Sequence, residues 1–161
     1  MNTPNEVLYG AIIIPAIYLY IFNNKINGFW NGLAHIFILE YIGILFCETV
    51  IFREPIMDST INTVLFWGYH DTTKDIYIDN LINIIAFIPI GFLSCIITKR
   101  YVIVKALFTG LFVSESIECC QLIFKRGSFD VDDIFNNTLG SLIGAIIYIF
   151  FVIIWKNIEL K

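Results

Sequence analysis

Five long apolar runs constrain this chain more than any other feature of its sequence. They occupy residues 7–22, 33–52, 80–98, 102–124 and 134–155. A helix of about 20 mostly apolar residues spans the hydrocarbon core of a bilayer. The 161 residues are 58% hydrophobic, whereas soluble domains average about 45–50%. We therefore predict an all-α, polytopic membrane helix bundle with about five transmembrane helices, forming a single domain over residues 1–161.

Charge and cysteine usage narrow the classes of partner. The formal net charge is −4, and no basic patch is present, so we expect the lipid bilayer and not nucleic acid as a partner. The four cysteines lie inside apolar runs, without the spacing of a zinc or redox motif. We read them as small buried hydrophobic residues.

The basic residues predict the orientation of the chain. Five spans place two sets of loops on opposite sides of the membrane. One side has Lys25, Lys99, Arg100, Lys105, Lys156 and Lys161. The other side has Arg53, Lys74, Lys125 and Arg126. Positive residues favour the cytoplasm, which predicts a bacterial cytoplasmic membrane protein with its N-terminus outside and its C-terminus in the cytoplasm.

Polar residues form stripes on the predicted spans, because helical positions three, four and seven apart share a face. The fourth span carries Ser114, Glu118, Gln121 and Lys125 at this spacing. The fifth begins with Asp133, Asn137, Gly140 and Gly144. The two glycines form a GxxxG motif, which lets another helix approach closely.

Further polar groups lie at the same membrane face. The third span contributes Asp79 and Asn83, and Arg53 follows the second span. We predict that they line an outward-facing polar and acidic pocket. The candidate substrate-binding residues are Arg53, Asn83, Gln121, Arg126 and Asn137.

Glu118 is the deepest acid and the candidate catalytic residue. Burial favours the neutral form of a carboxyl group unless a cation pairs with it, and such a group could act as a general acid or base. Intramembrane acids are costly and usually mark sites. The alternative is a structural hydrogen bond from Asn83 or Asn137 that fixes helix packing.

Two further groups have a functional and a structural interpretation. Asp130, Asp132 and Asp133 could bind a divalent cation through oxygen ligands, or Asp130 could cap the fifth helix. Arg126 could hold a phosphate or carboxylate bidentately, or pair with Asp130 or Asp133. No other cofactor is implied. The segment 59–69 is too short to span, and its aromatic residues suit an interfacial position.

Four blocks of the sequence resemble the VanZ-like family of small bacterial membrane proteins. They comprise Arg53 with residues 61–62 and 66–69, residues 83–91, the set Ser114, Glu118 and Gln121, and Arg126 with residues 130–133 and 137–140. Leu65 departs from the family's pattern, which often has proline there. The resemblance implies a bacterial cell-envelope protein. The family's named member is linked to low-level resistance to teicoplanin-type glycopeptides.

Three functions are consistent with these features. The first is a pocket that binds an envelope lipid, a cell-wall precursor or a glycopeptide, and so contributes to glycopeptide or lipoglycopeptide resistance. The second is a membrane enzyme that acts on a lipid or cell-wall precursor through Glu118 and the cluster Asp130–Asp133. The third is a small transporter. The sequence leaves enzymatic activity and oligomeric state open.

Overall fold

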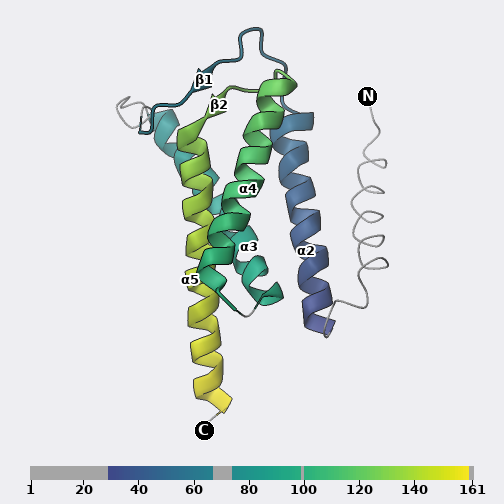
Figure 1. Ribbon diagram of the computed structural model, residues 1–161, viewed down its shortest axis with the longest axis vertical. Coiled ribbons are helices and arrows are strands. Elements are labelled where there is room, and N and C mark those ends of the chain that lie inside the picture. The colour runs from purple at the N-terminus through teal and green to yellow at the C-terminus, as the bar shows by residue number, and fades with distance from the viewer. Residues whose placement is uncertain (1–28, 67–73, 99, 160–161) are drawn as a thin grey trace.

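The computed structural model describes residues 29–66, 74–98 and 100–159, which form a mostly helical bundle (Figure 1). Helix α2 (Phe29–Phe46) continues into a π-helical turn, η2 (Cys47–Ile51), and is followed by α3 (Lys74–Ile97), α4 (Val102–Ile123) and α5 (Val131–Glu159). The predicted helical bundle is confirmed. Two short strands, β1 (Ile61–Asn62) and β2 (Phe129–Asp130), are an addition that the sequence did not predict.

Successive helices run in opposite directions, so α3 and α5 are parallel to each other (Figure 1). We call the end of the bundle that carries β1 and β2 the strand end. The opposite end, where α5 finishes, is the C-terminal end. Residue 53, the start of α3 and the start of α5 all lie at the strand end, so three chain segments far apart in sequence meet there.

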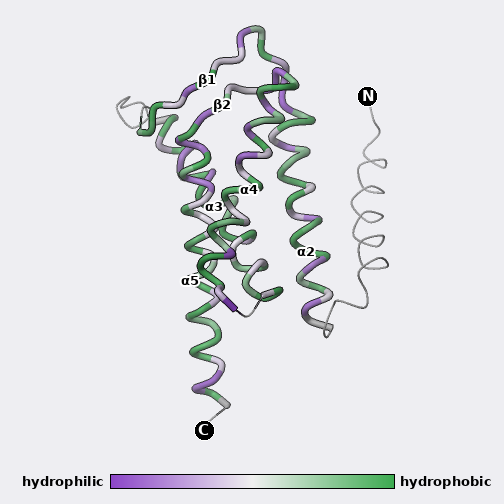
Figure 2. Tube along the Cα trace, viewed as in Figure 1, coloured by the Kyte–Doolittle hydropathy of each residue, from purple (hydrophilic) through white to green (hydrophobic). Residues whose placement is uncertain are grey.

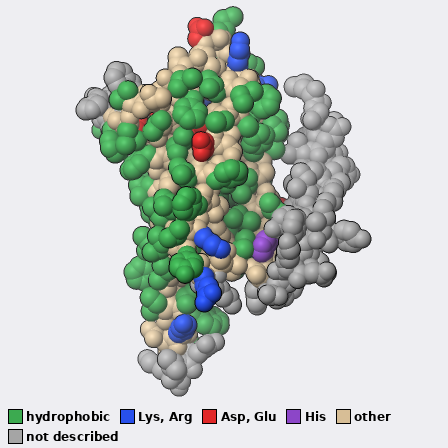
Figure 3. Space-filling model, in the orientation of Figure 1, with side chains coloured by type: hydrophobic (Ala, Val, Ile, Leu, Met, Phe, Trp, Pro, Cys, Tyr) green, Lys and Arg blue, Asp and Glu red, His purple; other side chains and the backbone are tan. Residues whose placement is uncertain are grey.

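Three of the described helices are long and apolar enough to cross a membrane. They cover Asn31–Ile51, Ile76–Ile97 and Val131–Ile158. Hydrophobic residues continue along the outer faces of the helices (Figures 2 and 3). Phe108, Phe112 and Phe150, for example, are each more than 60% exposed. Such a continuous apolar exterior suits contact with lipid.

The prediction of about five spans is not confirmed. The predicted span at residues 7–22 lies outside the described residues. Helix α4 has 22 residues but is not among the three apolar helices. Its length is sufficient, but Lys105, Glu115 and Glu118 lie within it and make it more polar than its neighbours.

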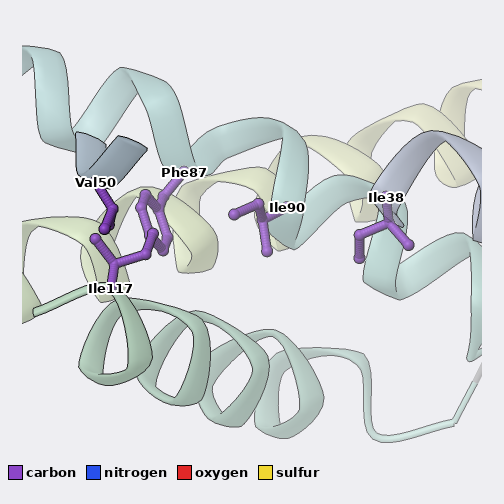
Figure 4. Packing of buried hydrophobic residues seen from close by; sticks show 5 residues of the cluster. All are labelled: Ile38, Val50, Phe87, Ile90 and Ile117. Atoms are coloured by element: carbon purple, nitrogen blue, oxygen red, sulfur yellow. The ribbon is translucent and has the colours of Figure 1, made fainter. Parts of the chain in front are cut away.

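Apolar side chains from four segments fill the centre of the bundle. Ile38 comes from α2, Val50 from η2, Phe87 and Ile90 from α3, and Ile117 from α4. Figure 4 shows Val50, Phe87 and Ile117 facing one another, with Ile90 and Ile38 further along the bundle. This core joins α2 and α4 to the same side of α3.

Helix α5 contacts α3 backbone to backbone. A methyl group placed on Gly140 would lie 2.1 Å from the Ile84 carbonyl oxygen, and one on Gly144 would lie 2.1 Å from that of Ile88. Real side chains never come so close. The close approach predicted from the GxxxG motif is therefore confirmed, and α3 is its partner.

We expect a substitution at this contact to destabilise the bundle. Gly140→Ala would force α5 away from the Ile84 carbonyl, and overpacking of this kind costs about 1–3 kcal/mol. Gly43→Ala is the matched control, because Gly43 lies in α2 with no atom near its missing methyl group. Both changes gain the same helix propensity. Thermal unfolding in detergent measures the difference, and equal stability of the two variants would contradict the proposed contact.

Candidate functional site

A two-stranded parallel sheet connects the segment after η2 to the start of α5. Ile61 lies opposite Phe129, and Asn62 lies opposite Asp130. The Phe129 amide donates to the Thr60 carbonyl at 2.9 Å, and the Thr60 hydroxyl donates to Ser128 Oγ at 2.9 Å. These bonds hold residues 60–62 over the N-terminus of α5 (Figure 1).

Asp130 is the last residue of β2, and its side chain caps α5. Its Oδ1 accepts the Asp132 amide at 2.8 Å, which satisfies one of the unpaired N–H groups at the helix start. Both carboxylate oxygens also accept the Asn62 Nδ2 amide at 3.3 Å. The capping interpretation of Asp130 is therefore confirmed.

The next two aspartates bind other segments of the chain. Asp132 is 3% exposed, and its Oδ1 accepts the backbone amide of Phe66. The Phe66 ring packs edge-on against Phe135 of α5, with the centroids 5.2 Å apart. Asp133 Oδ1 accepts Asn83 Nδ2 at 2.7 Å, which links α5 to α3. Each acid of the cluster thus has its own partner.

A pocket of about 450 Å³ opens between these segments at the strand end. It is lined by Arg53, Ile76, Asp79, Asn80, Ile82, Asn83, Asp130, Asp132 and Asp133. Two of the five predicted substrate-binding residues, Arg53 and Asn83, are therefore brought together with all three aspartates. The walls come from α3, β2, the first turn of α5 and Arg53, which follows η2.

The other predicted site residues lie outside this lining. Gln121 donates to the Thr49 carbonyl at 3.2 Å, and Asn137 donates to Ser114 Oγ at 2.9 Å. The Arg126 guanidinium donates to the Arg53 backbone carbonyl. These contacts join α4 and its following loop to η2 and α5, so the three side chains support the site from behind. A direct role for them in binding stays a prediction.

Glu118 lies behind β2. It is 2% exposed, and its Oε2 accepts the Asp130 backbone amide at 3.0 Å. A buried backbone N–H group must be paired, and this carboxylate pairs the one that precedes α5. The partner of Glu118 is thus the backbone of β2, whereas Asn83 and Asn137 donate to Asp133 and Ser114. A catalytic role for Glu118 stays a prediction.

The candidate cation site is not assembled by the described residues. Within residues 29–66, 74–98 and 100–159, no three histidine, cysteine or acidic side chains group together as metal ligands would. The aspartates 130, 132 and 133 instead accept hydrogen bonds from three different segments. Cation binding therefore stays a prediction from their sequence spacing.

Sequence reasoning missed Asn80. This residue is 9% exposed, lines the pocket, and accepts a 2.9 Å hydrogen bond from Asn136 of α5 at its Oδ1. The signal was present, because Asn80 and Asn83 are three residues apart and share a face of α3. Ile76 and Ile82 were missed because an apolar residue on a membrane helix is indistinguishable from a lipid-facing one.

We expect substitutions at Glu118 to show how much its hydrogen bond to the Asp130 amide contributes to stability. Glu118→Gln retains an acceptor oxygen and should change stability little. Glu118→Leu leaves the Asp130 amide unpaired, which costs about 1–3 kcal/mol. Glu115→Leu is the control, since Glu115 is exposed on the same helix. Thermal unfolding in detergent checks this order. Equal losses for Gln and Leu at position 118 would argue against the hydrogen bond.

Comparison with known proteins identifies the family. Neither a curated protein nor a solved structure shows significant similarity to the chain. The VanZ/LLP1 family, in contrast, matches residues 33–153. This match covers most of the 161 residues and includes every segment that lines the pocket. The chain therefore belongs to the VanZ/LLP1 family.

Proposed function

We propose that this protein is a cell-envelope protein of the bacterial cytoplasmic membrane, with the strand end outside and the C-terminus in the cytoplasm. The family supports the envelope location. The charge distribution of the full sequence supports the orientation, because six basic residues fall on the proposed cytoplasmic side and four, Arg53, Lys74, Lys125 and Arg126, fall on the side of β1 and β2. In this proposal residues 7–22 are the first of about five spans, and α4 is the fourth.

The proposed function is binding of an envelope component or an amphiphilic glycopeptide in the pocket at the strand end. The observation that supports this function is the composition of the pocket. Acidic, amide and guanidinium groups gather there, whereas much of the outer surface of the bundle is apolar. Asp79, Asp132 and Asp133 lie within candidate membrane spans, where ionisable residues are rare and often mark functional sites. A pocket facing outward would meet envelope lipids, cell-wall precursors and glycopeptides.

The apolar surroundings of the pocket favour an amphiphile. Ile76 and Ile82 are part of its lining. Ile78, Leu81 and Ile85 of the same helix are each more than half exposed. A ligand with a polar head and an acyl chain could place the head in the pocket and the chain along α3. Contribution to glycopeptide resistance then follows from binding of either the drug or its envelope target.

We expect expression of the protein to raise the minimal inhibitory concentration of a teicoplanin-type glycopeptide in a susceptible bacterium. Ile82→Trp should abolish this increase, because the larger side chain narrows a pocket of about 450 Å³. Leu81→Trp should retain it, since Leu81 is equally exposed, at 55%, but does not line the pocket. Dilution assays at matched membrane levels provide the measurement. No increase with the native chain would refute the resistance role.

The orientation is tested separately. We expect green fluorescent protein fused after Lys161 to fluoresce, because it should fold in the cytoplasm. Alkaline phosphatase at the same position should be inactive, since it requires export. A second fusion pair inserted at Asp58, in the loop that precedes β1, should give the opposite result. An active phosphatase after Lys161 would reverse the proposed topology.

A further inference from the structure

An apolar groove runs along α3 between α2 and α5, towards the C-terminal end of the bundle. A cavity of about 760 Å³ is lined there by residues that include Leu33 and Phe37 of α2, Leu93 of α3, and Phe151 and Trp155 of α5. A second cavity, of about 420 Å³, shares Phe37 and Leu93 with the first and extends the groove towards the strand end. Neither cavity shares a lining residue with the acidic pocket.

The described residues leave this groove uncovered. Phe37, Phe151 and Trp155 are each more than half exposed. Among the described residues that line the larger cavity, Lys156 alone is charged, and it lies towards the C-terminal end of α5. The cover of such a groove must be apolar. Lipid chains and an apolar helix both meet this condition, because they are equally hydrophobic.

Glu40 distinguishes between these two covers. It follows Leu33 and Phe37 and precedes Ile44 at helical spacing, so it continues the rim of the groove that α2 provides. It is half-buried, and it makes no hydrogen bond or ion pair with the residues that the structure describes. Acidic residues within membrane helices are costly and usually have a partner.

The depth of Glu40 argues against a lipid as this partner. The residue lies near the middle of the candidate span Asn31–Ile51, about 14–16 Å from either end at the rise of an α-helix. Lipid headgroups lie outside the hydrocarbon core, and an acyl chain has no hydrogen-bond donor. Glu40 therefore favours a protein segment that is apolar and carries a donor at this depth.

The apolar run at residues 7–22, outside the described part of the chain, meets both requirements. It contains no charged residue, and only residues 23–28 separate it from the start of α2 at Phe29. Helices joined by a short connection are antiparallel neighbours. The connection enters α2 one turn before Leu33, where the groove begins.

Tyr9 supplies a donor at the required depth. Glu40 lies 11 residues after Phe29, and Tyr9 lies 13 residues before Phe22. In two antiparallel helices these positions lie about 16 and 20 Å from the connection, a difference that a tyrosine side chain can span. The phenolic hydroxyl is a hydrogen-bond donor.

We propose that residues 7–22 dock as a helix in the groove between α2 and α5, where the Tyr9 hydroxyl donates to the Glu40 carboxylate. The segment is then antiparallel to α2 and parallel to α3 and α5. Ile14 lies as far from the connection as Phe37 does, so its turn faces the depth at which Phe37 and Phe151 line the groove. This inference is independent of the proposed function of the acidic pocket.

Disulfide cross-linking of the full chain in membranes tests the docking. Ile12, Ile13 and Ile14 are replaced with cysteine one at a time, which samples the rotation of the helix. Each is combined with Phe151→Cys in a chain whose four native cysteines are replaced with alanine. Phe150→Cys is the matched control, because Phe150 is 62% exposed on the same helix but does not line the groove.

We expect severalfold more disulfide with Phe151→Cys than with Phe150→Cys for at least one of the three isoleucine positions. A disulfide forms only when the two Cα atoms come within about 7 Å, and adjacent residues point to different sides of a helix. After oxidation, free thiols are blocked with N-ethylmaleimide, and mass spectrometry of the intact chain measures the fraction that lacks the adducts.

A second measurement tests the hydrogen bond in the chain with its native cysteines. Tyr9→Phe should lower the midpoint of thermal unfolding in detergent by about 2–4 °C, the effect of one hydrogen bond in a chain of this size. The same change should have no effect in the Glu40→Leu variant, which lacks the acceptor. Tyr20→Phe is the control, since Tyr20 lies in the same run but much closer to the connection.

Four results would overturn the proposal. Equal cross-linking to positions 150 and 151 would place the segment elsewhere on the bundle. Failure of all three isoleucine positions to cross-link would leave the groove to lipid chains. Disulfides that join two chains would make a second copy of the protein the cover. An equal loss of stability from Tyr9→Phe with and without Glu40 would refute the hydrogen bond between them.

Discussion

The contact between α3 and α5 holds the two main walls of the pocket at a fixed separation. Asn80, Ile84 and Ile88 of α3 meet Asn136, Gly140 and Gly144 of α5, each pair 56 positions apart in the chain. Both sets have a spacing of four, so the residues of each set lie on one face of their helix. Asn83 with Asp133, and Gly91 with the Ser141 backbone, extend the contact beside them. Lipid chains are as apolar as leucine, and helices in a bilayer therefore associate through close packing and hydrogen bonds. Here the glycines provide the packing, and the asparagines close the seam beside the pocket.

A second face of α5 binds α4 by the same means. Asn137 donates to Ser114, and the Ser141 hydroxyl donates to the Ala106 carbonyl at 2.7 Å. These positions each follow one residue after the seam residues 136 and 140, so adjacent faces of one helix serve two neighbours. Helix α5 is thus the element that α3 and α4 share, and its first turn is where the acidic residues of the pocket lie.

Helical periodicity predicted polar and close-packing faces on the helices, but it did not predict which side chains face each other. The GxxxG motif indicated a close helix partner, and the spacing of Asp133 with Asn137 suggested one polar face. The structure divides that face, because Asp133 contacts Asn83 of α3 whereas Asn137 contacts Ser114 of α4. A period of 3.6 residues cannot decide between two neighbours. The β1–β2 pair was also beyond the sequence, since a two-residue strand has no periodicity to detect.

The buried polar residues divide into two groups with different physical reasons for burial. Glu118 illustrates the first, because an acid inside a helix is costly and yet its carboxylate pairs a backbone amide that would otherwise be buried unpaired. This hydrogen bond gives the burial of Glu118 a structural reason in the turn into α5. Asn80 illustrates the second group, since its Oδ1 accepts from Asn136 of α5 whereas its Nδ2 is buried without a partner among the described residues. Asn137 behind the pocket is a further case, because its Nδ2 donates to Ser114 whereas its Oδ1 has no partner among the described residues.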